Sequence, residues 1–399
     1  MIGSSSIKGS RFGKGMEELV TLEREMPRFR VLHVLTLNGR NGEYGGPVRV
    51  ARELCMELNM RGHTTQIFSG VIKNSQPVSA PGLNESYVLV KPLWRKFRIS
   101  SLWSWGLIRP LGRYIKSSDV VHIHFARDLI PFLAAVLSIC YHKPYVTQTH
   151  GMIVFDGRFA TRLIDKILTR PLLNKSSTNL VLTTTEASAT MNLKIKSLSK
   201  EIPNGIDTNL PLQAKFSSNR TVAFCARLEE RKGVAKFIDL ASNFRDSGIQ
   251  FKIYGPDGGA LNSAKQSINL QNLENSVKYE GAIPAEEVQT VLKEVDLLIL
   301  PSKNEPYPMV VLEALAVGTP VLVMPSCGLA ETLRNFEPSF VATSESLAGL
   351  LESFSKQLVE EFCNKSRKEI YEFCIEMFGI KDVVDSLLQV YKGSINYEC

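Results

Sequence analysis

Cysteines are few and unpaired in this sequence. The 399 residues include seven cysteines that stand singly, and no C-x-x-C motif occurs. This spacing indicates neither a disulfide framework nor a structural zinc site. Unpaired cysteines are typical of a reducing compartment, so we expect a cytoplasmic protein.

Long apolar runs are also absent. The longest one, Leu129–Cys140, is roughly half the length of a bilayer span and contains Pro131. The first 28 residues are polar and lack the apolar core of a signal peptide. We therefore predict no transmembrane helix, and we expect residues 1–28 to form a flexible N-terminal extension.

What the chain does contain is typical of a soluble protein with two domains. Apolar residues make up 44% and charged residues 22% of the sequence, which are the usual shares for globular proteins. A chain of 399 residues is too long for one compact core. The net charge of +7 indicates only that an anionic partner is plausible.

Apolar runs of strand length alternate with helical segments along the chain, which predicts parallel sheets of the α/β class. The turn-forming cluster from Ile202 to Asp207 separates two such series and marks a domain boundary. The expected strands are Arg30–Leu37, Val120–Phe125, Pro144–His150, Leu180–Thr185, Thr221–Ala226, Phe251–Gly255, Val277–Gly281, Asp296–Leu300 and Pro320–Met324.

Two glutamates stand out in the stretch from Asp296 to Pro325. The helix expected over Met309–Val317 is almost wholly apolar but contains Glu313, and a carboxylate there needs a cation or several donors. Glu305 precedes the start of this helix, where backbone N–H groups and the helix dipole favour an anion. Spacing alone leaves a structural ion pair and a ligand site as alternatives, and it favours the ligand site.

Candidate ligand positions also occur in the first half of the chain. The loop with Gly45 and Gly46 precedes a helix that opens at Pro47, so a phosphate could approach its backbone, although ordinary tight turns use glycine as well. His150 ends an expected strand, at the edge where open α/β sheets bind ligands. A histidine satisfied within the core is the alternative for that position.

Three cations follow the strand Thr221–Ala226. Arg227, Arg231 and Lys232 stand just before a helix that starts at Val234. They could clamp a phosphate, since arginine binds such groups through two donors. An exposed turn of mixed charge is the alternative, and composition alone favours it.

His122 and His124 alternate along one strand, which places both side chains on one face of the sheet. A metal would need a third ligand nearby. The sequence identifies none, so we interpret the two histidines as structural and expect no metal site.

The stretch 91–116 combines basic and aromatic residues and contains no acid. Such a mixture suits an anionic membrane surface, and a solvated face with tryptophans in the core is an equal alternative. Nucleic acid is not expected as a partner, because no nucleic-acid-binding motif accompanies the stretch. The residues concerned are Lys91, Trp94, Arg95, Lys96, Phe97, Arg98, Trp103, Trp105, Arg109, Arg113, Tyr114 and Lys116.

Several motifs, taken together and in order, resemble those of the retaining glycosyltransferases of family 4. The resemblance covers nearly the whole chain from about Arg30, and its second half is the more specific part. The matching motifs are Gly45-Gly46, Thr149-His150-Gly151, Pro203-Asn204-Gly205-Ile206-Asp207, Arg227-Leu228 with Lys232-Gly233, Glu305 and Glu313 with seven residues between them, and Gly318-Thr319-Pro320-Val321.

The resemblance implies a GT-B fold, in which two Rossmann-like domains face each other across a cleft. Residues 29–202 would form the acceptor domain and residues 203–375 the nucleotide-sugar-binding domain. A C-terminal helix within 376–399 would cross back to the first domain. The implied activity is transfer of a hexose from a nucleotide-diphosphate sugar to a glycan or a lipid-linked glycan with retention of configuration, as in surface polysaccharide synthesis.

Roles for the candidate residues follow from the same resemblance. Glu313 would accept hydrogen bonds from the ribose, and Glu305 would contact the donor sugar. Arg227 and Lys232 would hold the diphosphate, and His150 would lie near the outer hydroxyls of the sugar. The backbone of Met309 and Val310 would meet the donor from the helix start, and Gly45 and Gly46 would close on it from the other domain.

Two departures from the usual pattern bear on the chemistry. Glu305-Pro306-Tyr307-Pro308 stands where many members have E-G-F-G, and proline offers no backbone N–H. No Asp-x-Asp triplet occurs, although transferases that hold the diphosphate through a metal commonly rely on one. We therefore expect no cofactor and no metal. An epimerase or phosphorylase of the same fold, or a non-catalytic nucleotide-binding scaffold, remains the alternative.

Overall fold

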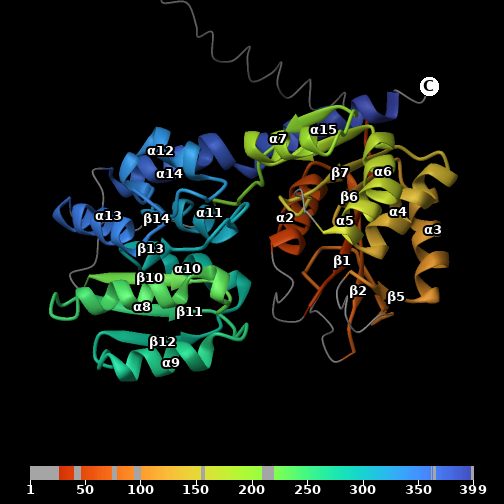
Figure 1. Cartoon of the computed structure of the whole chain (residues 1–399). Coiled ribbons are helices and arrows are strands. Elements are labelled where there is room, and N and C mark those ends of the chain that lie inside the picture. The colour runs from red at the N-terminus through yellow and green to blue at the C-terminus, as the bar shows by residue number, and fades with distance from the viewer. Residues whose placement is uncertain are drawn as a thin grey trace, which may run out of the picture.

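Two separate parallel sheets organise the chain. The computed structural model describes residues 27–39, 46–73, 79–93, 100–153, 158–208, 220–360, 362 and 365–396. The first sheet has the strand order β3-β2-β1-β6-β7-β8-β9, and the second has the order β12-β11-β10-β13-β14 (Figure 1). In each sheet the order reverses beside the first strand of that half, as in Rossmann-like folds. The fold is therefore GT-B, as predicted.

The strands of the first half lie between residues 30 and 201, and those of the second half between 221 and 323. A small antiparallel pair, β4 and β5, lies apart from the first sheet. The bounds are β1 Arg30–Leu37, β2 Thr64–Val71, β3 Glu85–Leu89, β4 Lys91–Pro92, β5 Leu102–Trp103, β6 Val120–His124, β7 Tyr145–Gln148, β8 Thr178–Val181, β9 Ser199–Glu201, β10 Thr221–Cys225, β11 Gln250–Tyr254, β12 Val277–Gly281, β13 Leu297–Leu300 and β14 Val321–Val323.

Helices connect the strands and flank both sheets (Figure 1). In the first half they are α2 Gly46–Met60, η2 Trp105–Leu107, α3 Ile108–Ser117, α4 Leu129–Cys140, α5 Phe159–Ile164, the π-helix η3 Asp165–Thr169, α6 Arg170–Lys175 and α7 Thr184–Asn192. In the second they are η4 Glu230–Lys232, α8 Val234–Asn243, α9 Leu261–Leu270, η5 Ala285–Glu287, α10 Val288–Lys293, α11 Met309–Leu315, α12 Ala330–Phe336, η6 Pro338–Phe340, α13 Leu347–Val359, α14 Arg367–Phe378 and α15 Ile380–Asn396.

One predicted strand is wrong in its placement. The apolar run at Leu180–Thr185 belongs only partly to a strand, because β8 ends at Val181 and α7 begins at Thr184. The side chain of Thr183 accepts a hydrogen bond from the N–H of Glu186 and so caps the helix. This is the threonine–glutamate spacing of a capped helix start, and it ends the strand early.

The chain crosses between the two halves twice, at neighbouring points. The N–H of Ile206 donates to the carbonyl of Phe378 at 2.9 Å, and the N–H of Ile380 donates back to Ile206 at 3.2 Å. After this second crossing, α15 packs against α2, β6 and β7 of the first half. The last helix thus covers the first sheet although it follows the second in sequence (Figure 1).

Candidate active site

Glu305 lies in the loop between β13 and α11 and is nearly buried. Its carboxylate accepts hydrogen bonds from Nζ of Lys232 at 2.6 Å and from Nη1 of Arg231 at 3.2 Å. Both cations belong to η4, the turn that follows β10. The group holds two cations and one carboxylate, so one positive charge is left over, and a polar ligand that enters must compete with one of these ion pairs.

The loop that carries Glu305 is held by a close approach of Gly328. The N–H of Gly328 donates to the carbonyl of Glu305 at 2.8 Å. A Cβ atom at Gly328 would lie 1.8 Å from the carbonyl oxygen of Pro306, so only glycine fits. The glycine therefore fixes the position of the loop against the end of β14.

Glu313 is buried in α11, and its ion-pair partner comes from the other half of the molecule. The guanidinium of Arg49, in the first turns of α2, contacts the carboxylate of Glu313. Nε of Arg49 also donates to Glu53 at 2.8 Å. Burial raises the pKa of Glu53, although the Arg49 cation acts in the opposite direction. One arginine therefore serves two carboxylates, one in each half.

Two further contacts bring the halves together beside these ion pairs. A Cβ atom on Gly151 would lie 2.3 Å from Cβ of Pro306, so the turn after β7 touches the Glu305 loop directly. A Cβ atom on Gly46 would lie 3.5 Å from Cγ of Met309, so the start of α2 lies against the start of α11. Candidate residues that are distant in sequence therefore meet at one interface.

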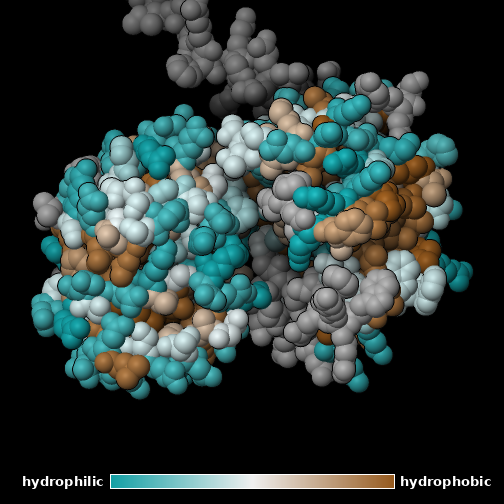
Figure 2. Space-filling model, in the orientation of Figure 1, coloured by the Kyte–Doolittle hydropathy of each residue, from teal (hydrophilic) through white to brown (hydrophobic). Residues whose placement is uncertain are grey.

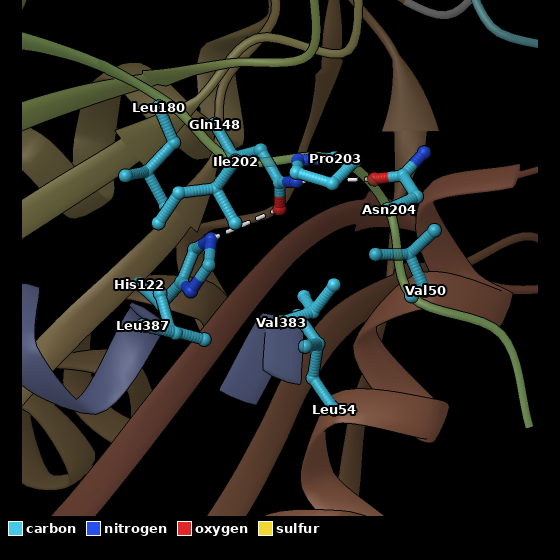
Figure 3. Close-up of a pocket in the computed structure, with 11 residues that line it drawn as sticks. Val50, Leu54, His122, Gln148, Leu180, Ile202, Pro203, Asn204, Val383 and Leu387 are labelled. Atoms are coloured by element: carbon cyan, nitrogen blue, oxygen red, sulfur yellow. Dashed lines mark hydrogen bonds between the residues drawn. The ribbon is translucent and has the colours of Figure 1, made fainter. Parts of the chain in front are cut away.

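A chain of buried amides and rings continues from this interface into the first half. Nδ2 of Asn204 lies 3.5 Å from the sulfur of Met309, and Oδ1 of Asn204 accepts from Gln148 at 3.1 Å. Gln148 in turn contacts Nε2 of His122 at 3.2 Å, and Nδ1 of His122 contacts the hydroxyl of Tyr391 at 2.7 Å. Figure 3 shows His122, Gln148 and Asn204 in this line.

The cavity beside this chain lies between the first sheet, α2, the crossing segment 202–205 and α15. Its volume is about 10 Å³, and it is lined by residues such as Val50, Leu180 and Val383 (Figure 3). That space is about the size of one water molecule. It cannot hold a nucleotide sugar, so the candidate site is the group of ion pairs around Glu305 and Glu313.

The expectation that no third imidazole lies near His122 and His124 is wrong. Strand β1 pairs with β6 so that His33 stands opposite His122, and the ligand-capable nitrogens of His33, His122 and His124 lie within 4.8 Å of one another. The rings of His122 and His124 are stacked at 4.7 Å. Each nitrogen of these two rings already contacts another polar group, so the cluster is arranged for mutual hydrogen bonding.

His150 is the outer member of this imidazole chain. Its Nε2 lies 2.7 Å from Nδ1 of His124, whose Nε2 lies 3.2 Å from Nδ1 of His33. Nε2 of His33 is buried with no hydrogen-bond partner among the described residues. If Nε2 of His33 carries no hydrogen, Nδ1 of His33 donates to Nε2 of His124, and Nδ1 of His124 donates to Nε2 of His150. His150 then carries its own hydrogen on Nδ1.

Burial keeps the four histidines neutral. Desolvation lowers the pKa of His122 and of His150 to about 3. It also lowers the pKa of His33 and of His124 well below the usual value, and the neighbouring histidines add to the effect. His150 has a left-handed backbone, with φ of 49°, which is an uncommon conformation that often marks a functional turn.

The structure gathers most, but not all, of the predicted site residues. Glu305, Lys232, Glu313 and Met309 lie at the interface with Gly46 and with Gly151, the residue after His150. The side chain of His150 itself contacts His124 in the first half. Val310 follows Met309 in the first turn of α11. Arg227 instead pairs with Glu229 at 3.4 Å, and Gly45 lies outside the described residues. Sequence reasoning named Arg231 only as one of the cations after β10, and it missed Arg49. Arg49 lies three residues after Gly46, and Arg231 immediately precedes Lys232.

The basic and aromatic stretch 91–116 is divided between core and surface in its described part. Trp103 packs against the buried cluster of the first half, and the hydroxyl of Tyr114 contacts Ser86 at 2.7 Å. Trp105 is 81% exposed. Arg109, Arg113 and Lys116 are exposed on α3. The predicted residues Trp94 to Arg98 lie outside the described part.

Two family models match the chain in succession. Residues 44–210 match the model described as Glycosyltransferase Family 4, and residues 207–373 match the model of glycosyl transferases group 1. Together they span both halves of the fold and the whole candidate site. The chain belongs to glycosyltransferase family 4.

Curated relatives of this glycosyltransferase are distant. A 2-deoxystreptamine N-acetyl-D-glucosaminyltransferase of Niallia circulans is 22% identical over 61% of this chain and 68% of its own length. Protein CapJ of Staphylococcus aureus is 25% identical over 71% of this chain and 74% of its own length. A putative colanic acid biosynthesis glycosyltransferase of Escherichia coli is 28% identical over 41% of this chain and 43% of its own length. The chain spans less than half the length of several curated relatives that it matches.

Solved structures agree on the fold. HepE of Anabaena, solved in complex with UDP and glucose, superposes with a TM-score of 0.72 at 16% identity over 92% of this chain and all of its own chain (100%). The lipopolysaccharide outer core galactosyltransferase WaaB gives a TM-score of 0.64 at 15% identity, over 93% of this chain and 100% of its own. Among the helices in the described ranges, none has the length and apolar character to cross a bilayer.

We expect the Arg49–Glu313 pair to be strongly coupled. Replacing Arg49 with Met leaves two nearly buried carboxylates without their cation, which costs on the order of 3 kcal/mol. The same change in a Glu313→Gln background should cost clearly less, because one of the stranded charges is gone. The melting temperatures of the four proteins in this cycle measure the coupling.

The exposed pair Arg30–Asp119 gives a matched control for that cycle. Its arginine side chain is 59% exposed, so Arg30→Met should lower the melting temperature much less than Arg49→Met. Equal effects of Arg49→Met in both backgrounds would contradict the ion pair.

The neutral histidines should make the protein sensitive to mild acid. Their pKa values are lowered in the folded state, so below about pH 6.5 the unfolded chain binds more protons than the folded one. Stability is therefore fully present above about pH 6.5. It should be lost as the pH falls toward the folded pKa values near 3, by up to about 1.4 kcal/mol per pH unit for each histidine.

Urea unfolding between pH 7.5 and pH 5 tests this pH dependence. His33→Gln removes one buried imidazole and should make the decline shallower than in the unmodified protein. His142→Asn replaces an exposed histidine of the same half and should leave the slope unchanged. Identical slopes for all three proteins would show that the buried histidines are not held neutral.

Proposed function

We propose that this glycosyltransferase moves a hexose from a nucleotide-diphosphate sugar to a glycan or lipid-linked glycan acceptor with retention of anomeric configuration, in polysaccharide or glycoconjugate synthesis. The observation that carries the proposal is that Lys232, Glu305 and Glu313 lie at the interface between the halves, where Gly151, the residue after His150, touches Pro306, the residue after Glu305. HepE, a protein of the same fold, was solved with UDP and glucose. Relatives named for colanic acid and amylovoran biosynthesis support the acceptor class.

The charges at the interface suit a donor with two phosphates. Lys232 and Arg231 face Glu305 at 2.6 and 3.2 Å. A diphosphate that enters would take over these cations and free the Glu305 carboxylate for the hydroxyls of the sugar. As the bond to the anomeric carbon breaks, the same cations stabilise the charge that develops on the leaving nucleotide. Arg227 is a third cation within the same turn region.

Glu313 fits the role of ribose ligand, and Arg49 would share it. A carboxylate has acceptor positions for more than one donor, so the two ribose hydroxyls could bind while Arg49 keeps the charge paired. We propose a same-face substitution without metal assistance. The protein supplies cations in the positions where a metal would otherwise neutralise the phosphates, and its sequence lacks Asp-x-Asp.

Other activities of the same fold make different demands. A phosphorylase would release a sugar phosphate and use no nucleotide, and an epimerase would need no acceptor. A non-catalytic scaffold would have no reason to keep two buried carboxylates with their cations, which are costly to bury. A lipid-linked acceptor would also require peripheral association with a membrane, to which the exposed cations of 91–116 could contribute.

A panel of nucleotides and nucleotide sugars tests donor binding. A ligand that binds only the native state raises the melting temperature. Glu313→Gln should weaken the best donor by about tenfold to a hundredfold, because it loses hydrogen bonds that a charged acceptor strengthens. Glu286→Gln, at an exposed position of η5, should bind normally. The scaffold alternative predicts binding without turnover, and unchanged binding by Glu313→Gln would refute the assigned site.

The stereochemical outcome tests the mechanism. Proton NMR of the first product formed from an α-linked nucleotide sugar should show an α-glycoside. The anomeric coupling constant distinguishes the two configurations directly. A β-linked product would show inversion and would exclude the same-face mechanism, without affecting the assignment of the nucleotide site.

A further inference from the structure

Large apolar side chains gather on one outer face of the N-terminal half. We call this the α4–α5 face, and it comprises Val136, Phe159, Leu163, Ile164 and Ile167. Phe159 is 81% exposed, Ile167 59% and Leu163 46%. Figure 2 shows a continuous hydrophobic patch where Figure 1 labels α4, α5 and α6. A contiguous apolar patch of this kind marks an interaction surface more often than a scatter of single residues does.

The helix at this face has its polar and apolar sides inverted relative to the usual arrangement. Thr161, Asp165 and Thr169 recur every four residues along α5 and η3, and all three are buried. The apolar residues Phe159, Leu163 and Ile167 have the same spacing but lie on the exposed side. A surface helix of a globular protein normally buries its apolar stripe. This helix therefore leaves its apolar stripe exposed on the surface.

The buried polar stripe is satisfied within the protein, so the orientation of the helix is fixed. Asp165 accepts hydrogen bonds from Nε of Arg127 at 2.8 Å and from Nη2 at 3.0 Å. Arg127 also donates to the carbonyl of Met152 at 3.3 Å. If the helix were rotated to bury its apolar stripe, the Arg127–Asp165 ion pair would become exposed. The exposed cations Arg162 and Lys166 would become buried. The outward apolar stripe is thus part of the packed structure.

Among the described residues of 158–175 and of α3, the exposed charges are all positive. The segment 158–175 contains one acid, Asp165, which is buried and paired with Arg127. Its exposed charged residues are Arg158, Arg162, Lys166 and Lys175. Helix α4 carries no charged residue. On its other side it packs against α3, where Arg109, Arg113 and Lys116 are exposed and no acid occurs.

We propose that the α4–α5 face docks this glycosyltransferase on an anionic lipid bilayer. Phe159, Leu163 and Ile167 would enter the interfacial layer, and the surrounding cations would meet the headgroups. An exposed apolar stripe bordered by Lys and Arg is the arrangement that binds such surfaces. A bilayer fits better than a protein partner, because anionic headgroups can meet the cations all around the face. The inference deepens the proposed function, since a docked enzyme would meet a lipid-linked acceptor.

Sedimentation with vesicles tests the docking. The full-length protein is mixed at low salt with vesicles of phosphatidylcholine, with and without phosphatidylglycerol. We expect it to sediment with the anionic vesicles and to be released as salt is raised. The triple variant Phe159→Ser, Leu163→Ser, Ile167→Ser should bind at least tenfold more weakly, as should Arg162→Glu with Lys166→Glu. Leu270→Ser, at a site 84% exposed on α9 of the other half, should bind as the unmodified protein does.

Three results would overturn the proposal. Equal vesicle binding by the triple variant would exclude the face, and loss of binding only in Trp105→Ser would assign docking to the stretch 91–116. Absence of vesicle binding, with a dimer that the triple variant converts to a monomer in size-exclusion chromatography, would make the face a contact between copies. Each variant should keep the donor-induced thermal shift. If no nucleotide sugar raises the melting temperature of the unmodified protein, that result counts against the proposed function and not against docking.

Discussion

A carboxylate buried in an apolar helix has to be met by a cation, and at Glu313 that cation comes from the opposite half of the chain. Arg49 reaches across from α2 to make this contact, and it also holds Glu53 beside it. The arrangement links the nucleotide side of the proposed site to α2 in the first half of the chain. Occupancy at Glu313 and the relative position of the two halves are therefore coupled. The packing of Gly46 on Met309 and of Gly151 on Pro306 depends on that same position.

The two glutamates differ in the kind of partner they have. Glu305 is paired within its own half, with cations from the next loop of the same sheet edge. Glu313 is paired between halves. This difference suits a site where the diphosphate and sugar replace the ion pairs of Glu305 within one half. Binding of the ribose at Glu313 would depend on how the two halves are arranged. The carboxylates are thus unlike an acid and base pair that shares one substrate bond.

The sheets and most site residues could be predicted because they follow local patterns. The short strand that ends in Gly281 and the apolar helix that starts after Pro308 were both predicted with the correct bound at that end. Contacts that depend on how two strands are paired could not be predicted from the pattern of either strand alone. His33 joins His122 only because β1 and β6 pair in parallel with those residues opposite each other. The outward stripe of Phe159, Leu163 and Ile167 has the periodicity of a core-facing helix, and only the burial of Asp165 with Arg127 reveals its true orientation.

The two crossings of the chain between its halves have a mechanical consequence. Ile206 is hydrogen-bonded to the backbone on either side of Gly379, and a Cβ atom on Gly205 would lie 3.0 Å from Cα of Ile380. The connections therefore run as a joined pair instead of as independent tethers. A single tether permits swivelling about several directions, whereas two joined ones restrict rotation mainly to an axis through the junction. Opening of the halves would then follow one reproducible arc, and each return would bring the same residues back into register.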